Sequence, residues 1–113
     1  MAFESEPDLS PEEVQERVDE TIADNEVVLF MKGTALMPQC GYSRKALGLI
    51  DHHRDDVATV NVLDALDAYR DALSEHSGRE TIPQTFVDGE FVGGSDILEQ
   101  LHEQGDLAET LNA

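Results

Sequence analysis

The sequence predicts an α/β fold in which helices flank a mainly apolar sheet, and two observations support this class. A helix-like stretch joins the first two strand-like stretches, and such a unit has parallel strands and a right-handed crossover. Later, the dipeptide Asp88-Gly89 separates two short strand-like runs, which is a strong hairpin signal. We expect one domain over residues 1–113, in which residues 1–9 form a loose acidic tail.

The first helix is predicted from its start signal. Ser10 can act as N-cap, Pro11 takes the first helical position, and Glu13 closes a capping box. Asn25 marks the end of this helix. Between these points one apolar stripe repeats at four-residue spacing: Val14, Val18 and Ile22.

The middle of the chain predicts strand, helix, strand and helix. A strand is expected over about 26–31, because the continuously apolar run 27–31 is typical of a buried strand. This strand is followed by a helix over about 41–53, a strand over 57–61, and a helix over about 65–76 that Asp64 is expected to cap. The residues expected to face inward are Leu47, Ile50, Leu66, Tyr69 and Leu73.

The last third begins with a turn over 78–83, followed by strands 84–87 and 90–92. A helix opens near Gly94 and stops at Gly105. Its inward residues are expected to be Ile97, Leu98 and Leu101, and Asp106 is expected to cap a short last helix ending near Leu111. This order of elements, with a loop of special composition after the first strand, is a thioredoxin-type layout.

The net charge limits the classes of partner that the chain is expected to bind. The chain has 25 acidic and 7 basic residues, a net charge of −18, which argues against nucleic acid and anionic membranes as partners. The apolar fraction of 40% is ordinary for a folded protein. Because the acids are spread along the chain, we interpret them as adaptation to high salt, where screening acts beyond about 3 Å at 1 M.

The expected cellular location depends on whether the sequence has a membrane-spanning segment or a signal peptide. Its longest unbroken apolar run is five residues, far too short to span a membrane, and residues 1–25 do not resemble a signal peptide. We therefore expect a cytoplasmic protein. One cysteine also excludes a disulfide within the chain.

That cysteine, Cys40, lies between the first strand and the second helix. A helix N-terminus favours an anion, so the position should lower the pKa of the thiol. Residues 27–50 contain no Asp or Glu, where a uniform spread would place about five, and they include Lys32, Arg44 and Lys45. The alternative is a buried cysteine that only fills the core.

Three stretches in order make the chain resemble the monothiol glutaredoxins over about residues 25–111. They are Met31-Lys32-Gly33-Thr34 with Pro38-Gln39-Cys40-Gly41-Tyr42-Ser43, then Thr81-Ile82-Pro83-Gln84, then Gly89-Glu90-Phe91-Val92-Gly93-Gly94-Ser95-Asp96. The resemblance implies a thioredoxin-like fold with a four-stranded mixed sheet flanked by helices, and a cis peptide bond before Pro83.

The resemblance also implies roles for individual residues. Cys40 would be the reactive thiolate and the cluster ligand. The residues expected to bind a glutathione-like thiol are Lys32 and Arg70 for its glycine carboxylate, Thr81 and Ile82 for its cysteinyl part, and Gly94, Ser95 and Asp96 for its γ-glutamyl group.

Each role has a structural alternative. Lys32 can be a solvated lysine, Arg70 can pair with Asp67 or Asp71 on its own helix, and Tyr42 can be a core aromatic. The Gly93-Gly94 pair can be only a hairpin exit and a helix cap, and the four histidines are expected at the surface: His52, His53, His76 and His102.

The sequence departs from the family pattern at three places. Tyr42 stands where the family usually has Phe, and Ser95 where many members have a second cysteine. Arg79-Glu80 replaces an aromatic–proline pair, which could alter the rim of the ligand groove.

Two functions fit a single reactive thiol. A [2Fe–2S] cluster needs four ligands, and one chain supplies only Cys40. Two chains and two small thiols complete the set, which predicts a cluster-bridged homodimer. The resemblance implies that such a homodimer delivers its cluster to apo iron–sulfur proteins. The small thiol would be glutathione or another γ-glutamyl thiol.

The alternative function is a weak glutathione-dependent thiol–disulfide oxidoreductase acting on protein mixed disulfides by a monothiol mechanism. Without a second cysteine, an external thiol must complete each cycle. A third possibility, a non-catalytic adaptor, would leave Cys40 without a role, and the acid-free stretch around it argues against that.

Overall fold

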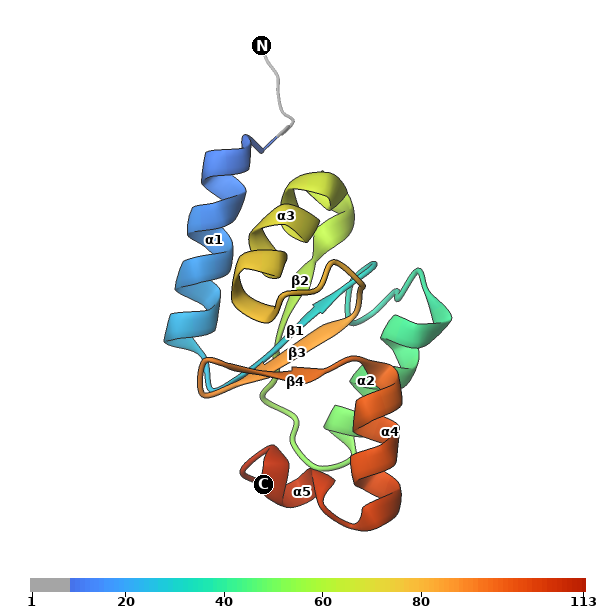
Figure 1. The fold of residues 1–113 in the computed structure, drawn as a ribbon. Coiled ribbons are helices and arrows are strands. Elements are labelled where there is room, and N and C mark those ends of the chain that lie inside the picture. The colour runs from blue at the N-terminus through green and yellow to red at the C-terminus, as the bar shows by residue number, and fades with distance from the viewer. Residues whose placement is uncertain (1–8) are drawn as a thin grey trace.

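A four-stranded sheet lies between two layers of helices in the computed structural model, which describes residues 9–113 (Figure 1). The strands are β1 (Val27–Met31), β2 (Ala58–Asn61), β3 (Gln84–Val87) and β4 (Glu90–Gly93), in the order β2-β1-β3-β4. β1 pairs with β2 in parallel and with β3 antiparallel, and β3 and β4 are antiparallel. The mixed sheet of the thioredoxin-like fold is therefore confirmed.

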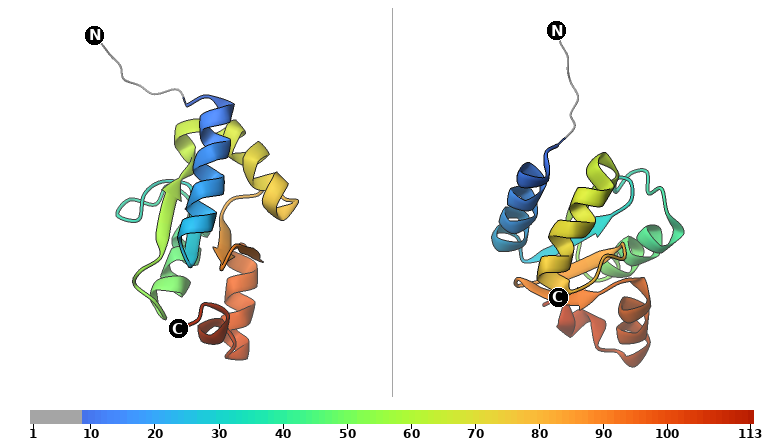
Figure 2. Two further views of the ribbon diagram at one scale, coloured as in Figure 1. Left: turned by 90° about the vertical axis from the view of Figure 1, so that its left-hand side faces the viewer. Right: turned by 45° about the horizontal axis from the view of Figure 1, so that its top comes forward.

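Helices cover both faces of this sheet. α1 (Pro11–Asp24) and α3 (Leu66–Ser77) lie side by side on one face, as Figures 1 and 2 show. α2 (Gly41–Asp51) and α4 (Ser95–Gln104) pack together on the other. The short α5 (Leu107–Thr110) contacts α4.

The central strand β1 divides the hydrophobic core in two. All five of its residues are buried. Successive side chains of a strand point to opposite faces, so Val28 and Phe30 join the core under α1 and α3. The other three, Val27, Leu29 and Met31, join the core under α2, α4 and α5. This two-sided burial explains why the strand is continuously apolar.

The start of α1 is confirmed in detail. The Glu13 amide donates to Ser10 Oγ (3.1 Å) and the Ser10 amide donates to Glu13 Oε1 (2.9 Å), which completes the capping box. The apolar stripe is buried: Val14, Val18 and Ile22. Leu9, the last residue of the expected loose tail, is half-buried and packs against this core. The rest of that tail lies outside the described residues.

Two predicted caps are wrong. Asp64 does not cap α3, because the chain leaves β2 through a 3₁₀ turn (Val62–Ala65) that contains Asp64. Asn61 caps this turn instead, since its side chain accepts a hydrogen bond from the Leu63 amide (3.0 Å). Asp106 occupies the N-cap position of α5 but has helical backbone angles, so its side chain makes no capping bond.

One predicted core residue is also misplaced. In α4 Leu98 is buried and Leu101 is half-buried, as expected, but Ile97 is 42% exposed. The reason is local: Ile97 packs over Gly93, where an added Cβ would come within 2.6 Å of the Ile97 Cβ. Ile97 therefore belongs to the surface beside the start of α4.

The β3–β4 hairpin and the turn before it agree with expectation. Asp88 and Gly89 both have positive φ, 52° and 83°, which matches a type I′ turn. The Ile82–Pro83 peptide bond is cis, as the family resemblance implied. Within residues 9–113 no helix combines the length and apolar character needed to cross a membrane.

Three histidines meet where α2 and α4 end. The ring centroid of His52 is 4.9 Å from that of His53 and 5.5 Å from that of His102. The centroids of His53 and His102 are 5.6 Å apart. His52 and His102 are exposed, as expected, but His53 is half-buried. Burial, followed by the neighbouring His52 and His102, lowers the pKa of His53.

This cluster predicts a loss of stability in acid. A histidine whose pKa is lowered by folding stabilises the native state above its unfolded pKa of about 6.5, and this contribution disappears as the pH falls below that value. His53→Gln should therefore lose less thermal stability than the wild type between about pH 7 and pH 5. Melting temperatures measured across this range test the prediction.

The control is Gln104→Ala, which changes an exposed residue at the end of α4 without removing a titratable group and should keep the wild-type acid loss. Parallel stability curves for the wild type and His53→Gln would contradict the prediction.

Candidate functional site

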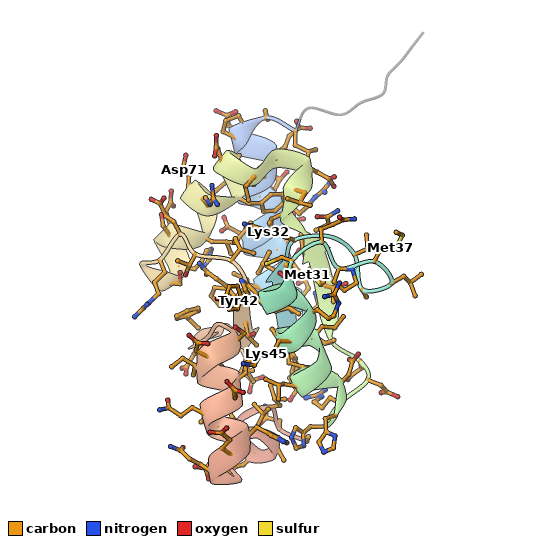
Figure 3. All side chains as sticks on the ribbon, turned by 90° about the vertical axis from the view of Figure 1, so that its right-hand side faces the viewer. Met31, Lys32, Met37, Tyr42, Lys45 and Asp71 are labelled. Carbon is orange, nitrogen blue, oxygen red and sulfur yellow. The ribbon has the colours of Figure 1, made fainter. Side chains whose placement is uncertain are left out.

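The loop after β1 folds back on itself as a narrow hairpin. Gly33 and Pro38 form an isolated β-bridge. Inside it, the Thr34 amide donates to the Met37 carbonyl (3.2 Å) and the Met37 amide donates to the Thr34 carbonyl (3.1 Å). The turn leaves the Leu36 and Met37 side chains exposed, and Figure 3 shows Met37 extending away from the body of the molecule.

Only glycine fits at position 33. Its φ is +93°, and an added Cβ would lie 2.5 Å from the backbone nitrogen of Gln39. That close approach lets the Gln39 amide donate to the Lys32 carbonyl (2.9 Å). The loop therefore returns to the end of β1 directly before Cys40.

Two side chains fix the loop to the rest of the fold. Asn61 Oδ1 accepts a hydrogen bond from the Gly33 amide (3.0 Å), which ties the loop to the end of β2. Ser43 Oγ accepts one from the Lys32 amide (3.0 Å), and Ser43 is fully buried in the first turn of α2. Sequence analysis missed both roles, because the bonded residues are 28 and 11 positions apart.

Cys40 occupies the N-cap position of α2, as predicted, and is half-buried rather than enclosed in the core. The Ser43 amide lowers the pKa of its thiol most, and the Tyr42 amide, the charge of Lys32 and the Ser43 hydroxyl lower it further. Partial burial opposes these contributions. The arrangement favours the thiolate, which is the form that attacks disulfides and binds metals.

A groove of about 460 Å³ opens beside the start of α2. One wall is the segment that contains the cis proline, and the other is the N-terminus of α4, where an added Cβ on Gly94 would lie 3.1 Å from the Pro83 carbonyl oxygen. Five residues predicted from the sequence line the groove together: Thr81, Ile82, Gly94, Ser95 and Asp96.

Three further residues line this groove: Tyr42, Arg79 and Ile97. Tyr42 is 64% exposed, so the core alternative for it is wrong. The sequence did point to Arg79, because Arg79-Glu80 stands where the family usually has an aromatic–proline pair. Ile97 was predicted to lie in the core because its spacing fits an apolar helix stripe.

The two predicted carboxylate-binding cations lie outside the lining of the groove. Arg70 Nη1 is 3.7 Å from Asp67 Oδ1, which is the helix-surface pairing given as its alternative. Lys32 has no ion pair within residues 9–113 and lowers the pKa of Cys40. Figure 3 shows Lys32 between α2 and α3, on the side of the molecule where Tyr42 lies in the first turn of α2.

The described part of the chain contains no group of three or more His, Cys, Asp or Glu side chains placed to hold a metal ion. The histidine cluster is included in this statement. Cys40 is thus a single sulfur ligand that needs ligands from elsewhere.

Comparisons with known proteins agree with the geometry. The family model described as Glutaredoxin matches residues 27–92. A monothiol glutaredoxin of Synechocystis sp. is 43% identical over 99 residues, which cover 88% of this chain and 92% of the relative. The chain belongs to the glutaredoxin family, and several of its relatives, the Synechocystis protein among them, are named monothiol glutaredoxins.

Solved structures show the same fold. The solution structure of reduced apo GrxS14 from poplar is 35% identical with a TM-score of 0.76, over 88% of this chain and 90% of that one. A crystal structure of a buckwheat glutaredoxin–glutathione complex is 26% identical with a TM-score of 0.75, over 90% of each chain.

Lys32 is the part of the thiol environment that a side-chain substitution removes most cleanly. Lys32→Gln should raise the pKa of Cys40, because it deletes a nearby positive charge, yet leave it below the usual value, because the Ser43 and Tyr42 amides remain. A titration of the ultraviolet absorbance of the thiolate measures this. Arg17→Gln, on α1, makes the same change in net charge and should have no effect. An unchanged titration in Lys32→Gln would contradict the assignment.

Proposed function

We propose that this monothiol glutaredoxin carries a [2Fe–2S] cluster as a homodimer and delivers it to apo iron–sulfur proteins. One observation supports this most: a single thiol with a lowered pKa lies two residues before Tyr42, which lines a groove of small-molecule size. The described residues also contain no group of three or more His, Cys, Asp or Glu side chains that could hold a metal ion without outside ligands.

The number of thiolate ligands that the cluster needs determines how many chains must assemble around it. Four thiolates hold a [2Fe–2S] cluster, and each chain has one cysteine. Two chains provide two thiolates through Cys40, and two small thiols seated in the two grooves provide the others. Cys40 fits this role because it is half-buried at the edge of the fold, where a partner can reach it.

Charge supports the same face as the meeting point of two chains. Two chains of net charge −18 repel each other over most of their surfaces. Residues 27–50 carry no acidic side chain, and Lys32 and Arg44 lie there without an ion pair to a described residue. A cluster with four thiolates is itself anionic, so these cations would also favour the cargo.

We infer that the small thiol is glutathione or another γ-glutamyl thiol. Asp96 lies at the start of α4 and lines the groove, where its carboxylate can bind an ammonium group. The free amides at this helix start favour a carboxylate. A γ-glutamyl group carries both charges on one carbon. A related buckwheat glutaredoxin has been solved as a glutathione complex.

The second candidate is a weak monothiol oxidoreductase, favoured by the lowered pKa of Cys40. The Cys40 thiolate would attack the glutathione sulfur of a protein mixed disulfide, form a Cys40–glutathione disulfide and release the protein thiolate. A second glutathione thiolate would then attack the glutathione sulfur, release Cys40 and leave glutathione disulfide.

We further propose that the protein works in a cytoplasm of high salt concentration. No Asp or Glu within residues 9–113 is buried, so the acids form a hydrated surface. Screening at high salt reduces the repulsion among them.

Anaerobic reconstitution with iron, sulfide and glutathione or γ-glutamylcysteine tests the carrier function. We expect a coloured dimer with two irons per pair of chains, lost when the thiol is omitted and absent in Cys40→Ser, because each removes half of the ligands. Visible absorption and sedimentation in high salt measure this.

A Cys40→Ser variant that still binds the cluster would contradict the ligand assignment. A colourless monomer that reduces a glutathione mixed disulfide would favour the oxidoreductase instead.

A further inference from the structure

Gln84 connects the core to the groove. It is the first residue of β3 and is fully buried, on the sheet face that carries its register partner Phe30. Its Nε2 donates to the Arg79 carbonyl (2.8 Å) and to the Thr81 carbonyl (3.0 Å). One buried amide thus holds two carbonyls that are two residues apart.

Both carbonyls belong to the wall of the groove. Arg79 and Thr81 line it, and Ile82 and Pro83 continue the wall. This segment has no helix or strand hydrogen bonds of its own, and the Arg79 amide bonds to the Ser77 hydroxyl (3.1 Å). Backbone groups without regular partners need others to stay fixed. The Ser77 hydroxyl donates to the Arg79 carbonyl (3.2 Å), and Gln84 donates to both the Arg79 and the Thr81 carbonyls.

Glutamine suits this task by its chemistry. Its amide nitrogen carries two hydrogens, one for each carbonyl, whereas a glutamate carboxylate donates none and an aliphatic side chain cannot hydrogen-bond. The Gln84 Oε1 atom is buried and has no partner among the described residues, so the side chain is satisfied only on the face that holds the wall.

We propose that Gln84 is a positioning residue for thiol binding. It fixes the Thr81 and Ile82 backbone in the geometry that pairs with the cysteinyl part of a γ-glutamyl thiol, an inference that rests on the proposed function. A wall that is fixed before binding loses less conformational freedom when the ligand arrives, which increases affinity.

The next residue provides a matched control. Thr85 is also fully buried, and its Oγ1 also lacks a partner. It pairs with Leu29, whose side chain lies in the other core, so Thr85 faces away from Gln84. Thr85→Val therefore changes a buried polar side chain on the same strand without touching the wall.

The experiment compares wild type, Gln84→Leu and Thr85→Val. S-methylglutathione and S-methyl-γ-glutamylcysteine serve as probes, because their blocked sulfur prevents exchange with Cys40. We expect binding to weaken about tenfold in Gln84→Leu and to stay unchanged in Thr85→Val. Backbone ¹⁵N relaxation should show greater mobility of Thr81 and Ile82 only in Gln84→Leu, which loses the bonds to the Arg79 and Thr81 carbonyls.

A further readout separates positioning from general damage. The pKa of Cys40 should be the same in all three proteins, because its hydrogen-bond donors lie on α2. If Gln84→Leu does not fold, Gln84→Met, with a flexible side chain of similar length, replaces it.

A folded Gln84 variant that binds the probes as tightly as the wild type would overturn the inference. If the wild type binds neither probe, the proposed thiol binding fails instead. The backbone mobility of Thr81 and Ile82 then still decides the role of Gln84, since unchanged mobility in Gln84→Leu overturns it.

Discussion

Burial of β1 on both faces is the constraint on which the rest of the structure depends. Its five apolar residues anchor two separate cores, and those cores hold α1 and α3 on one side and α2, α4 and α5 on the other. The register of β1 with its neighbours also sets the site. Its last residue, Met31, lies beside Asn61 of β2, and Phe30 lies beside Gln84 of β3. The loop between β1 and Cys40 therefore starts between Asn61, which bonds to that loop, and Gln84, which bonds to the groove wall.

The groups that favour the Cys40 thiolate differ in their sensitivity to salt. The charge of Lys32 acts through space and at a partly exposed position, so dissolved ions weaken it. The Ser43 and Tyr42 amides act at hydrogen-bond distance and keep their effect when ions are present. Because the largest contribution comes from the backbone of α2, the reactivity of the thiol depends mainly on the helix start. A protein with so acidic a surface gains from this arrangement at any salt concentration.

Features set by neighbouring residues were predictable from the sequence. The capping box of Ser10 and Glu13, the Asp88-Gly89 turn and the position of Cys40 at a helix start each depend on a few adjacent positions. The misses involve contacts that only the tertiary fold creates. Asp64 matches the composition of a cap, but the route out of β2 makes Asn61 the cap. The histidine cluster joins the ends of two helices about fifty residues apart, a separation that no local pattern reports.

Both proposed functions use the groove and the thiol together, and the fold accounts for their proximity. Cys40 follows β1, one groove wall precedes β3, and the other begins α4, so the fold brings together three segments that are distant in sequence. The chain has one cysteine, so in either of the two proposed functions the second sulfur must come from another molecule. In the proposed function, a small thiol held in the groove with fixed orientation replaces the resolving thiol that the chain lacks. Gly33, the buried Ser43 and the buried Gln84 fix the loop and the groove wall that this function would use.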